Sequence, residues 1–202
     1  VKRTVQNEER RDPGVQTQPV SIKVYVIIYK TFCALLLQHI LYCSYDKIIV
    51  SKHQIHGRAN ERRHNMKVTS SGIIDGVIQD KYGKRGECNA LGMPICSLPL
   101  SKEDAPEGTK SFAVVIDDKD AFPVSGGFVC IHWAAANICR TELKENESQT
   151  ADDFVQGVNS WMSIQGGQHP AESCSYYGGM APPDAPHIYD IHVYALDTTL
   201  DL

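Results

Sequence analysis

The sequence predicts an all-β protein, and three short stretches carry most of that prediction. Residues 111–117, 128–137 and 187–197 are apolar runs rich in Val, Ile, Phe and Tyr, and turns with Gly, Pro and acidic residues separate them. No 3.6-residue period runs through these stretches, so we expect strands and not helices. Only residues 152–164 have a composition that suits a short helix or a turn.

The chain of 202 residues divides into two parts of opposite charge. Residues 1–65 carry eleven Lys and Arg against five Asp and Glu, a net charge of +6, whereas residues 66–202 carry nine against nineteen, a net charge of −10. All four methionines lie at or after Met66, which indicates a possible natural start there. We therefore expect a domain of residues 66–202 that holds all of the compact β structure. Residues 1–65 are expected to be an extension that contributes little to it.

Composition also restricts the partners and the compartment. A net charge of −4 gives no electrostatic reason to expect nucleic acid as a partner. The longest charge-free apolar run, residues 31–45, is shorter than the roughly 20 residues of a spanning helix, so no spanning membrane segment is expected. An interfacial amphipathic anchor is the alternative for that region. Seven cysteines, an odd number without a C-x-x-C pair, indicate reduced thiols and a cytoplasmic protein.

The period of two along a strand determines which polar side chains lie together. His187 and Tyr189 share one face of their strand, and His192 lies on the other face. By the same count, His132 shares a face with Cys130 and Ala134. Cys130 and His132 are metal-ligand types, but a zinc site needs about four ligands, so no metal is expected.

Carboxylates follow the first of the three strands. Asp117, Asp118 and Asp120 come where a buried run meets a turn, a place where loops often carry binding sites. A solvated acidic turn is the alternative interpretation. Combined with two imidazoles and a phenol, such a group suits the binding of a small anion by N–H and O–H donors.

A series of short motifs occurs in one order along the second part of the chain. It comprises S-L-P-L at 97–100, D-A-P-E-G-T-K-S-F-A at 104–113, D-x-D-A at 118–121, H-W at 132–133, Y-G-G-x-A-P-P at 177–183, H-x-Y at 187–189 and V-Y-A-L-D at 193–197. With these motifs, residues 66–202 resemble the phosphatidylethanolamine-binding protein family, in its bacterial Raf-kinase-inhibitor-like branch. The resemblance implies a β-sandwich of antiparallel sheets with a small pocket for phosphate-like anions or phospholipid head groups.

Carried over position by position, the resemblance implies a set of ligand-binding residues: Asp118, Asp120, His132, Ala181, Pro182, Pro183, His187 and Tyr189. We expect the aspartates to accept N–H bonds from the imidazoles, whose other ring nitrogens then face the ligand. The expected function is non-catalytic binding without a cofactor. Inhibition or scaffolding of a kinase or protease is the alternative. A hydrolase is less favoured, because the G-x-S-x-G, H-E-x-x-H and Walker A motifs are absent.

The sequence departs from the family pattern at three places. The usual D-P-D-A-P is D-K-D-A-F at residues 118–122, without either proline, and the usual H-R-Y is H-I-Y at residues 187–189. The family also continues beyond the A-L-D strand, so we expect a sandwich that lacks its C-terminal elements. An unpaired strand edge left there would lower stability and promote aggregation.

Overall fold

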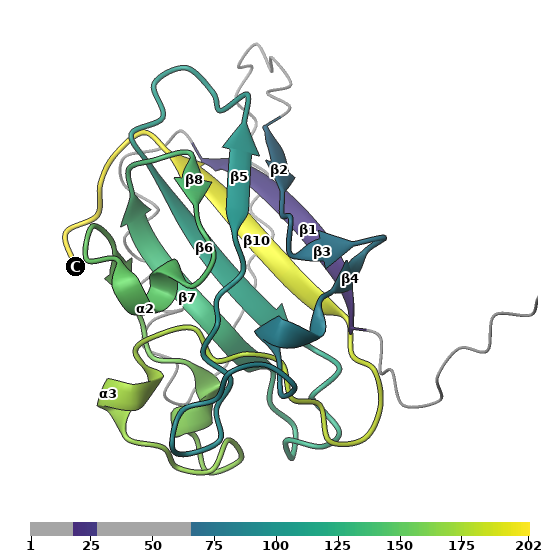
Figure 1. The fold of residues 1–202 in the computed structure, drawn as a ribbon. Helices are drawn as coiled ribbons and strands as arrows, with labels where there is room; N and C mark the ends of the chain where they lie inside the picture. Colours follow the sequence, from purple (N-terminus) through teal and green to yellow (C-terminus); the bar gives the residue numbers. More distant parts are fainter. Residues whose placement is uncertain (1–17, 28–65) are drawn as a thin grey trace, which may run out of the picture.

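The computed structural model describes residues 18–27 and 66–202, whose strands form two sheets (Figure 1). The strands are β1 (Gln18–Ile27), β2 (Lys67–Thr69), β3 (Ile73–Ile74), β4 (Val77–Ile78), β5 (Leu100–Glu103), β6 (Ser111–Asp118), β7 (Cys130–Ile138), β8 (Glu142–Leu143), β9 (Val155–Gln156) and β10 (Tyr189–Leu196). Within the described ranges, four single-turn helices join them: η1 (Asp80–Tyr82), α2 (Glu147–Thr150), η2 (Ser160–Met162) and α3 (Ala171–Cys174).

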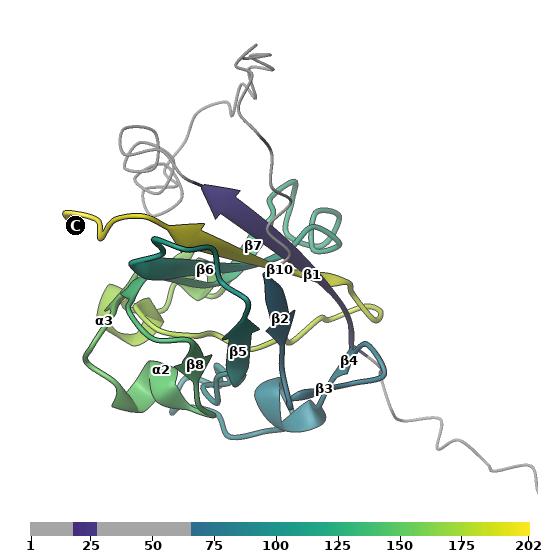
Figure 2. The ribbon, with the colours of Figure 1, turned by 90° about the horizontal axis from the view of Figure 1, so that it is seen from above.

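The two sheets form the predicted all-β sandwich. The larger has the order β3-β4-β1-β10-β6-β7-β9, and the smaller has the order β2-β5-β8. Seen from above, the smaller sheet lies on one side of the larger (Figure 2). The three predicted strands are β6, β7 and β10, which differ from their expected bounds by at most two residues at either end. Within residues 18–27 and 66–202, no helix is long and apolar enough to cross a bilayer.

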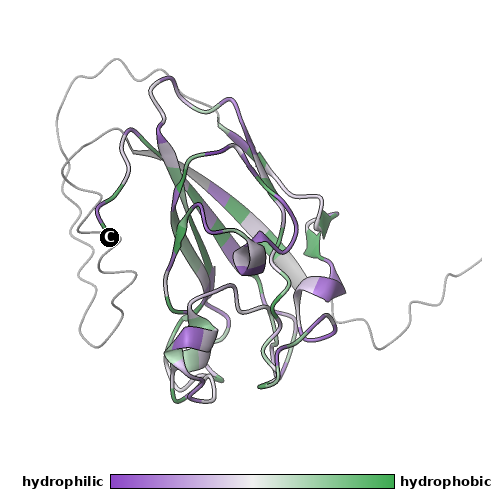
Figure 3. Cartoon of the chain, turned by 60° about the vertical axis from the view of Figure 1, so that its left-hand side comes forward, coloured by the Kyte–Doolittle hydropathy of each residue, from purple (hydrophilic) through white to green (hydrophobic). Residues whose placement is uncertain are grey.

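The main core lies between the two sheets. It receives Phe112, Val114 and Ile116 from β6, and it receives Ile191 and Val193 from β10, all of them buried. Each fully buried side chain of this size stabilises the fold by about 1.5 to 3 kcal/mol relative to exposure. Figure 3 shows hydrophobic residues along the long strands. The alternation along β10 confirms that Tyr189 faces the core and that His192 faces away from it.

β1 corrects the expectation for the first part of the chain. It pairs in parallel with β10 from Val20 opposite Tyr189 to Ile27 opposite Leu196, and it pairs with β4 on its other side. The expectation that residues 66–202 hold all of the β structure is therefore wrong for β1. The distributions of charge and methionine describe only composition, so they did not indicate this strand. The apolar and β-branched residues of β1 suit a strand beside β10. A domain boundary at residue 65 stays a prediction.

The position of β1 also changes the expectation about the last strand. β10 lies between β1 and β6, so it is not an edge strand, and the unpaired edge expected there is absent from the described sheet. The pairing of β1 with β10 is parallel, so the large sheet is not wholly antiparallel. An ion pair between Lys23 Nζ and Asp190 Oδ2, 2.5 Å apart, supports the register of these two strands.

A β-bulge sets the direction of His132. Along the pairing of β6 with β7, Trp133 lies opposite Ile116, and Ile131 lies opposite Asp117, so His132 is an extra residue between them. An inserted residue bends its strand and re-aims the side chain.

The bulge brings two consecutive side chains to the same side of the sheet. The Trp133 ring packs edge-on against Tyr177, with centroids 5.9 Å apart, and the His132 ring binds the carbonyl of the next residue, Gly178. A strict alternation of side chains along β7 therefore predicts the wrong face of the sheet for His132. The prediction that His132 shares a face with Ala134 is wrong, because the inserted residue shifts the alternation by one.

Candidate functional site

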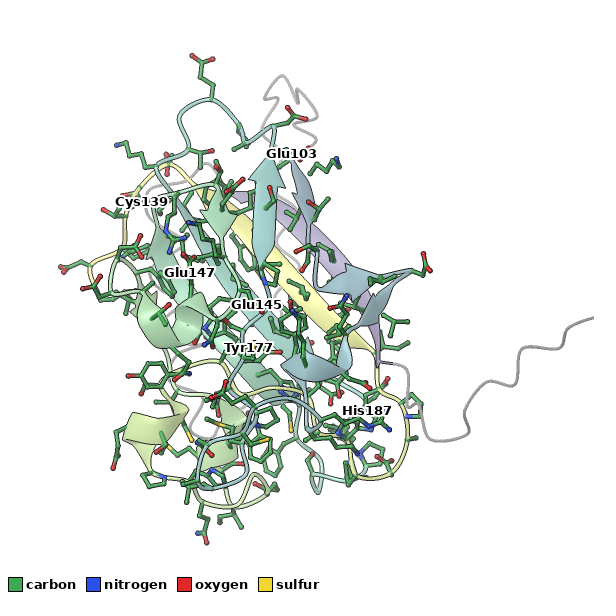
Figure 4. All side chains as sticks on the ribbon, viewed as in Figure 1. Glu103, Cys139, Glu145, Glu147, Tyr177 and His187 are labelled. Atoms are coloured by element: carbon green, nitrogen blue, oxygen red, sulfur yellow. The ribbon has the colours of Figure 1, made fainter. Side chains whose placement is uncertain are left out.

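The candidate site lies where one end of the large sheet meets its connecting loops. β6 ends at Asp118, β7 begins at Cys130, and β10 begins at Tyr189, so the three predicted strands bring their site residues to one end. Figure 4 shows His187 at this end and Glu103 at the opposite end.

Asp118 is the central acceptor of the site. Its Oδ2 lies 2.8 Å from His187 Nδ1, and its Oδ1 accepts a hydrogen bond of 3.0 Å from the backbone N–H of Ala121. Burial acts to raise the pKa of this carboxyl, but the nearby imidazoles of His132 and His187, the second through a hydrogen bond, outweigh burial and lower the pKa. Asp118 therefore fixes both the imidazole and the start of the loop after β6.

His187 is held between two carboxylates. Its Nδ1 faces Asp118, and its Nε2 lies 2.9 Å from Asp184 Oδ1. Burial acts to lower the pKa of His187, yet the hydrogen bonds and charges of both aspartates outweigh burial and raise the pKa. With an acceptor on each nitrogen, the arrangement stabilises the doubly protonated imidazolium.

His132 has one bonded and one unbonded ring nitrogen. Nδ1 lies 2.7 Å from the carbonyl oxygen of Gly178, which can only accept, so Nδ1 carries a proton. Nε2 is buried, has no hydrogen-bond partner among the described residues, and lies 3.9 Å from Asp118 Oδ2. The unbonded nitrogen is therefore in position to bind a further group.

The Gly178 carbonyl reaches His132 because this segment packs very closely. A Cβ on Gly178 would lie 2.6 Å from the Trp161 ring, and a Cβ on Gly179 would lie 2.4 Å from the carbonyl oxygen of Tyr82. Both distances are shorter than ordinary contacts, so only glycine fits at these two positions.

Tyr189 supplies the second unbonded polar atom. Its hydroxyl is buried and has no hydrogen-bond partner among the described residues. The Tyr189 ring meets the His132 ring edge-on, with centroids 5.3 Å apart. Burial, with a smaller contribution from the charge of Asp118, raises the pKa of Tyr189, so its hydroxyl stays protonated and can donate.

Asp120 and the Pro-rich loop of residues 181–183 take part in hydrogen bonds that involve backbone groups. Asp120 Oδ2 accepts a hydrogen bond of 2.8 Å from the N–H of Ile188, which fixes the chain beside His187. Lys84 Nζ donates to the carbonyl oxygen of Pro182 at 2.9 Å, and the Lys84 N–H donates to Met180. Of the predicted loop residues, Pro182 is buried, Ala181 is partly buried, and Pro183 is exposed.

The structure corrects one expectation about this chemistry. We expected both imidazoles to turn a ring nitrogen toward a ligand, but both nitrogens of His187 are occupied by carboxylates. In this site, the buried atoms without a hydrogen-bond partner among the described residues are His132 Nε2 and the Tyr189 hydroxyl. Sequence reasoning missed Asp184 and Lys84. A carboxylate three residues before His187 was the signal for Asp184, whereas nothing in the sequence pairs Lys84 with the Pro-rich loop.

A second polar cluster lies on the opposite face of the sheet. Asp117, Asp190 and His192 place their ligand atoms within 4.8 Å of one another. Lys23 and Lys119 both pair with Asp190, and despite burial these ammonium groups lower the pKa of Asp190 to about 2. The two lysines already balance the negative charge of this cluster.

The fold and the site together define a class: β-sandwich proteins with a buried Asp, His and Tyr group at one end of the larger sheet. A profile of the phosphatidylethanolamine-binding protein family matches residues 68–202. The chain belongs to this family, as the sequence motifs predicted. The match begins two residues after Met66 and does not include β1.

Relatives with known sequences and structures agree with this family. The uncharacterized protein YxkA of Bacillus subtilis is 40% identical over 130 residues, which cover 62% of this chain and 77% of that protein. The crystal structure of Escherichia coli YbcL, titled a new member of the mammalian PEBP family, is similar with a TM-score of 0.52 and 30% identity. That similarity covers 68% of this chain and 80% of the YbcL chain. A putative phosphatidylethanolamine-binding protein homologue from Chlamydia trachomatis gives a TM-score of 0.51 and 29% identity, over 69% of this chain and 80% of that chain.

Proposed function

We propose that this protein binds a phosphate-like anion or a phospholipid head group, without catalysis, between His132 and Tyr189. The observation that carries the proposal is a pair of buried, unbonded polar atoms, His132 Nε2 and the Tyr189 hydroxyl, on rings 5.3 Å apart. Leaving such groups buried without a partner costs about 1 to 3 kcal/mol each, and an anion that accepts from both removes that cost. Family membership supports this proposal.

The proposed binding depends on protonation. His132 Nδ1 is bonded to a carbonyl, so the neutral ring leaves Nε2 without a proton, and only the imidazolium can donate to an anion. Binding of an anion through Nε2 therefore requires the doubly protonated ring.

Calorimetric titration of inorganic phosphate and phosphoethanolamine at pH 6 and pH 8 tests the proposal. His132→Ala and Tyr189→Phe each remove one donor, so each should weaken binding about tenfold, since a hydrogen bond to a charged group contributes about 1.5 to 3 kcal/mol. Tyr194→Phe removes a hydroxyl from the other face of the same strand and should leave affinity unchanged, as should His192→Ala. Equal losses in the site variants and in these controls would contradict the assignment.

The same contacts favour binding over hydrolysis. A general base needs an unbonded nitrogen beside a nucleophile, but both nitrogens of His187 are bonded to carboxylates. No Ser or Cys of the described residues is bonded to His132 Nε2. Phosphoethanolamine should be recovered intact after long incubation, and generic esterase substrates should not be hydrolysed. Release of inorganic phosphate above the rate of the buffer would contradict a non-catalytic role.

One observation favours the second candidate function, the inhibition or scaffolding of a kinase or protease. Four apolar side chains between β6 and β7 are 41% to 55% exposed: Phe122, Val124, Phe128 and Val129. This loop starts at Asp118, so a protein partner bound to it would lie beside the site. If this function holds, Phe122→Ser should reduce inhibition of a target kinase or protease without changing phosphate affinity.

The five described cysteines are free, which supports a cytoplasmic location.

A further inference from the structure

One lysine side chain lies in the interior of the sandwich, outside the candidate site. Lys102 belongs to β5, the central strand of the smaller sheet, and the residue is only 2% exposed. Its Nζ lies over the ring of Phe112 from β6, 5.1 Å from the ring centroid. This nitrogen is buried, and no group of the described residues forms a hydrogen bond with it. The side chain therefore points from the smaller sheet toward the larger sheet and ends at an aromatic face.

The surroundings of Lys102 disfavour its protonated form. Burial lowers the pKa of its amine to about 8, and the charge of Arg140, between β7 and β8, acts in the same direction. Glu142 and Glu147 act in the opposite direction and do not compensate. At pH 7.5 the amine is therefore neutral in about a quarter of the molecules, compared with roughly one in a thousand for an ordinary lysine.

A neutral amine without a hydrogen bond is a nucleophile, because its lone pair is neither protonated nor shared. The burial of Lys102 restricts the electrophiles that can reach it. A charged reagent such as bicarbonate would have to lose its hydration to enter the interior. Carbon dioxide is small and uncharged, so its entry carries no such cost. The chemistry of the position therefore selects CO₂ as the reactant.

We propose that Lys102 is a site of reversible carbamylation by CO₂. The lone pair of Nζ forms a bond to the carbon of CO₂, the electrons of one C=O π bond move to oxygen, and one proton leaves Nζ for the solvent. The product is an N-carboxylate, and nothing is oxidised or reduced. An anion then attracts the Arg140 guanidinium, whereas the ammonium repels it. The proposal involves no residue of the candidate site.

The test is the detection of the carbamate in the whole protein. Incubation with ¹³C-labelled bicarbonate at pH 7.5 supplies labelled CO₂, and a trialkyloxonium salt then converts the labile carbamate into a stable ester. Peptide mass spectrometry locates the label. We expect labelled ester on Lys102 and none on Lys110, an exposed lysine that serves as the control within the same protein. Absence of the ester from Lys102, or equal labelling of both lysines, would overturn the proposal.

A second measurement follows the carbamate by ¹³C NMR. At a fixed concentration of dissolved CO₂, the signal should increase about tenfold from pH 7 to pH 9, as the amine of Lys102 loses its proton. Transfer to buffer without CO₂ should remove the signal, because the reaction is reversible. A signal that does not change with pH would overturn the proposal.

The matched variant is Lys102→Met, which removes the amine and keeps an unbranched side chain that suits the interior. The carbamate signal should be absent from this variant. A signal of unchanged size would place the carbamate on another amine and would overturn the proposal. If the variant does not fold, the mass spectrometry of the wild-type protein decides by itself.

Discussion

His187 Nδ1 and Asp118 Oδ2 are 2.8 Å apart, and both side chains are buried. The imidazole comes from the loop two residues before β10 and the carboxylate from the end of β6, so their hydrogen bond joins the ends of two neighbouring strands at the base of the site. Each group holds the other in its charged form, because the pKa of His187 is raised and the pKa of Asp118 is lowered. The pair therefore connects the protonation of the site to the stability of the fold.

The first prediction concerns pH. A raised pKa means that His187 stabilises the fold fully below its ordinary value of 6.5, and that this stabilisation is lost as the pH rises through the folded-state value. His187→Gln should therefore lower the free energy of unfolding more at pH 6 than at pH 9. Urea denaturation of both proteins at the two pH values measures the difference. An equal loss at both values would show that His187 is not charged in the folded protein.

The second prediction concerns the carboxylate. Asp118→Asn removes the partner of a buried imidazolium and should cost about 3 kcal/mol of stability. Asp80→Asn, at an exposed pair with Arg85, should cost less than about 1 kcal/mol. Thermal unfolding compares the two variants. An NMR titration of His187 should also show a lower pKa in Asp118→Asn, and an unchanged titration would contradict the assigned pair.

The third prediction concerns the close approach at the site. Gly179→Ala places a Cβ 2.4 Å from the Tyr82 carbonyl oxygen, so the segment must shift, at a cost of about 1 to 3 kcal/mol. The shift should also weaken the bond between Gly178 and His132. Chemical denaturation measures the first effect, and phosphate affinity measures the second. Glu172→Ala, at an exposed position of α3, is the control, and equal stability of the two variants would rule out the clash.

The fourth prediction concerns β1. A chain that begins at Met66 loses the strand beside β10, which leaves the backbone groups of β10 unpaired on that side. Unpaired strand edges recruit other chains, so this shorter chain should melt at a lower temperature and self-associate. Scanning calorimetry and gel filtration compare it with the full chain. Equal melting temperatures and equal monomer fractions would mean that β1 adds nothing to the fold.

Local sequence patterns were sufficient to predict the three long strands β6, β7 and β10 and most of the residues of the candidate site. The apolar runs of β6, β7 and β10 are long enough to be recognised, and motif order placed Asp118, His132, His187 and Tyr189 in the site. The structure brings these four together at one end of the sheet, and whether they bind the proposed ligand is a prediction that the titrations above test.

The features that sequence patterns did not predict depend on contacts between different segments of the chain. The bulge at His132 arises from the register of β7 against β6, and a count of alternate residues cannot reveal an insertion. The place of β1 depends on a partner near the other end of the chain. Asp184 is near His187 in sequence, but its role depends on Asp118 having already taken the other ring nitrogen.

The parallel pairing of β1 with β10 has a consequence for the order in which the protein folds. On the ribosome, β1 is made before β10, and this partner emerges only after some 160 further residues have been synthesised. Contacts so distant along the chain are slow to form, because a long loop must close before they stabilise anything. β1 must therefore remain unpaired with β10 until the segments between them have been synthesised, and the large sheet can be completed only after β10 leaves the exit tunnel.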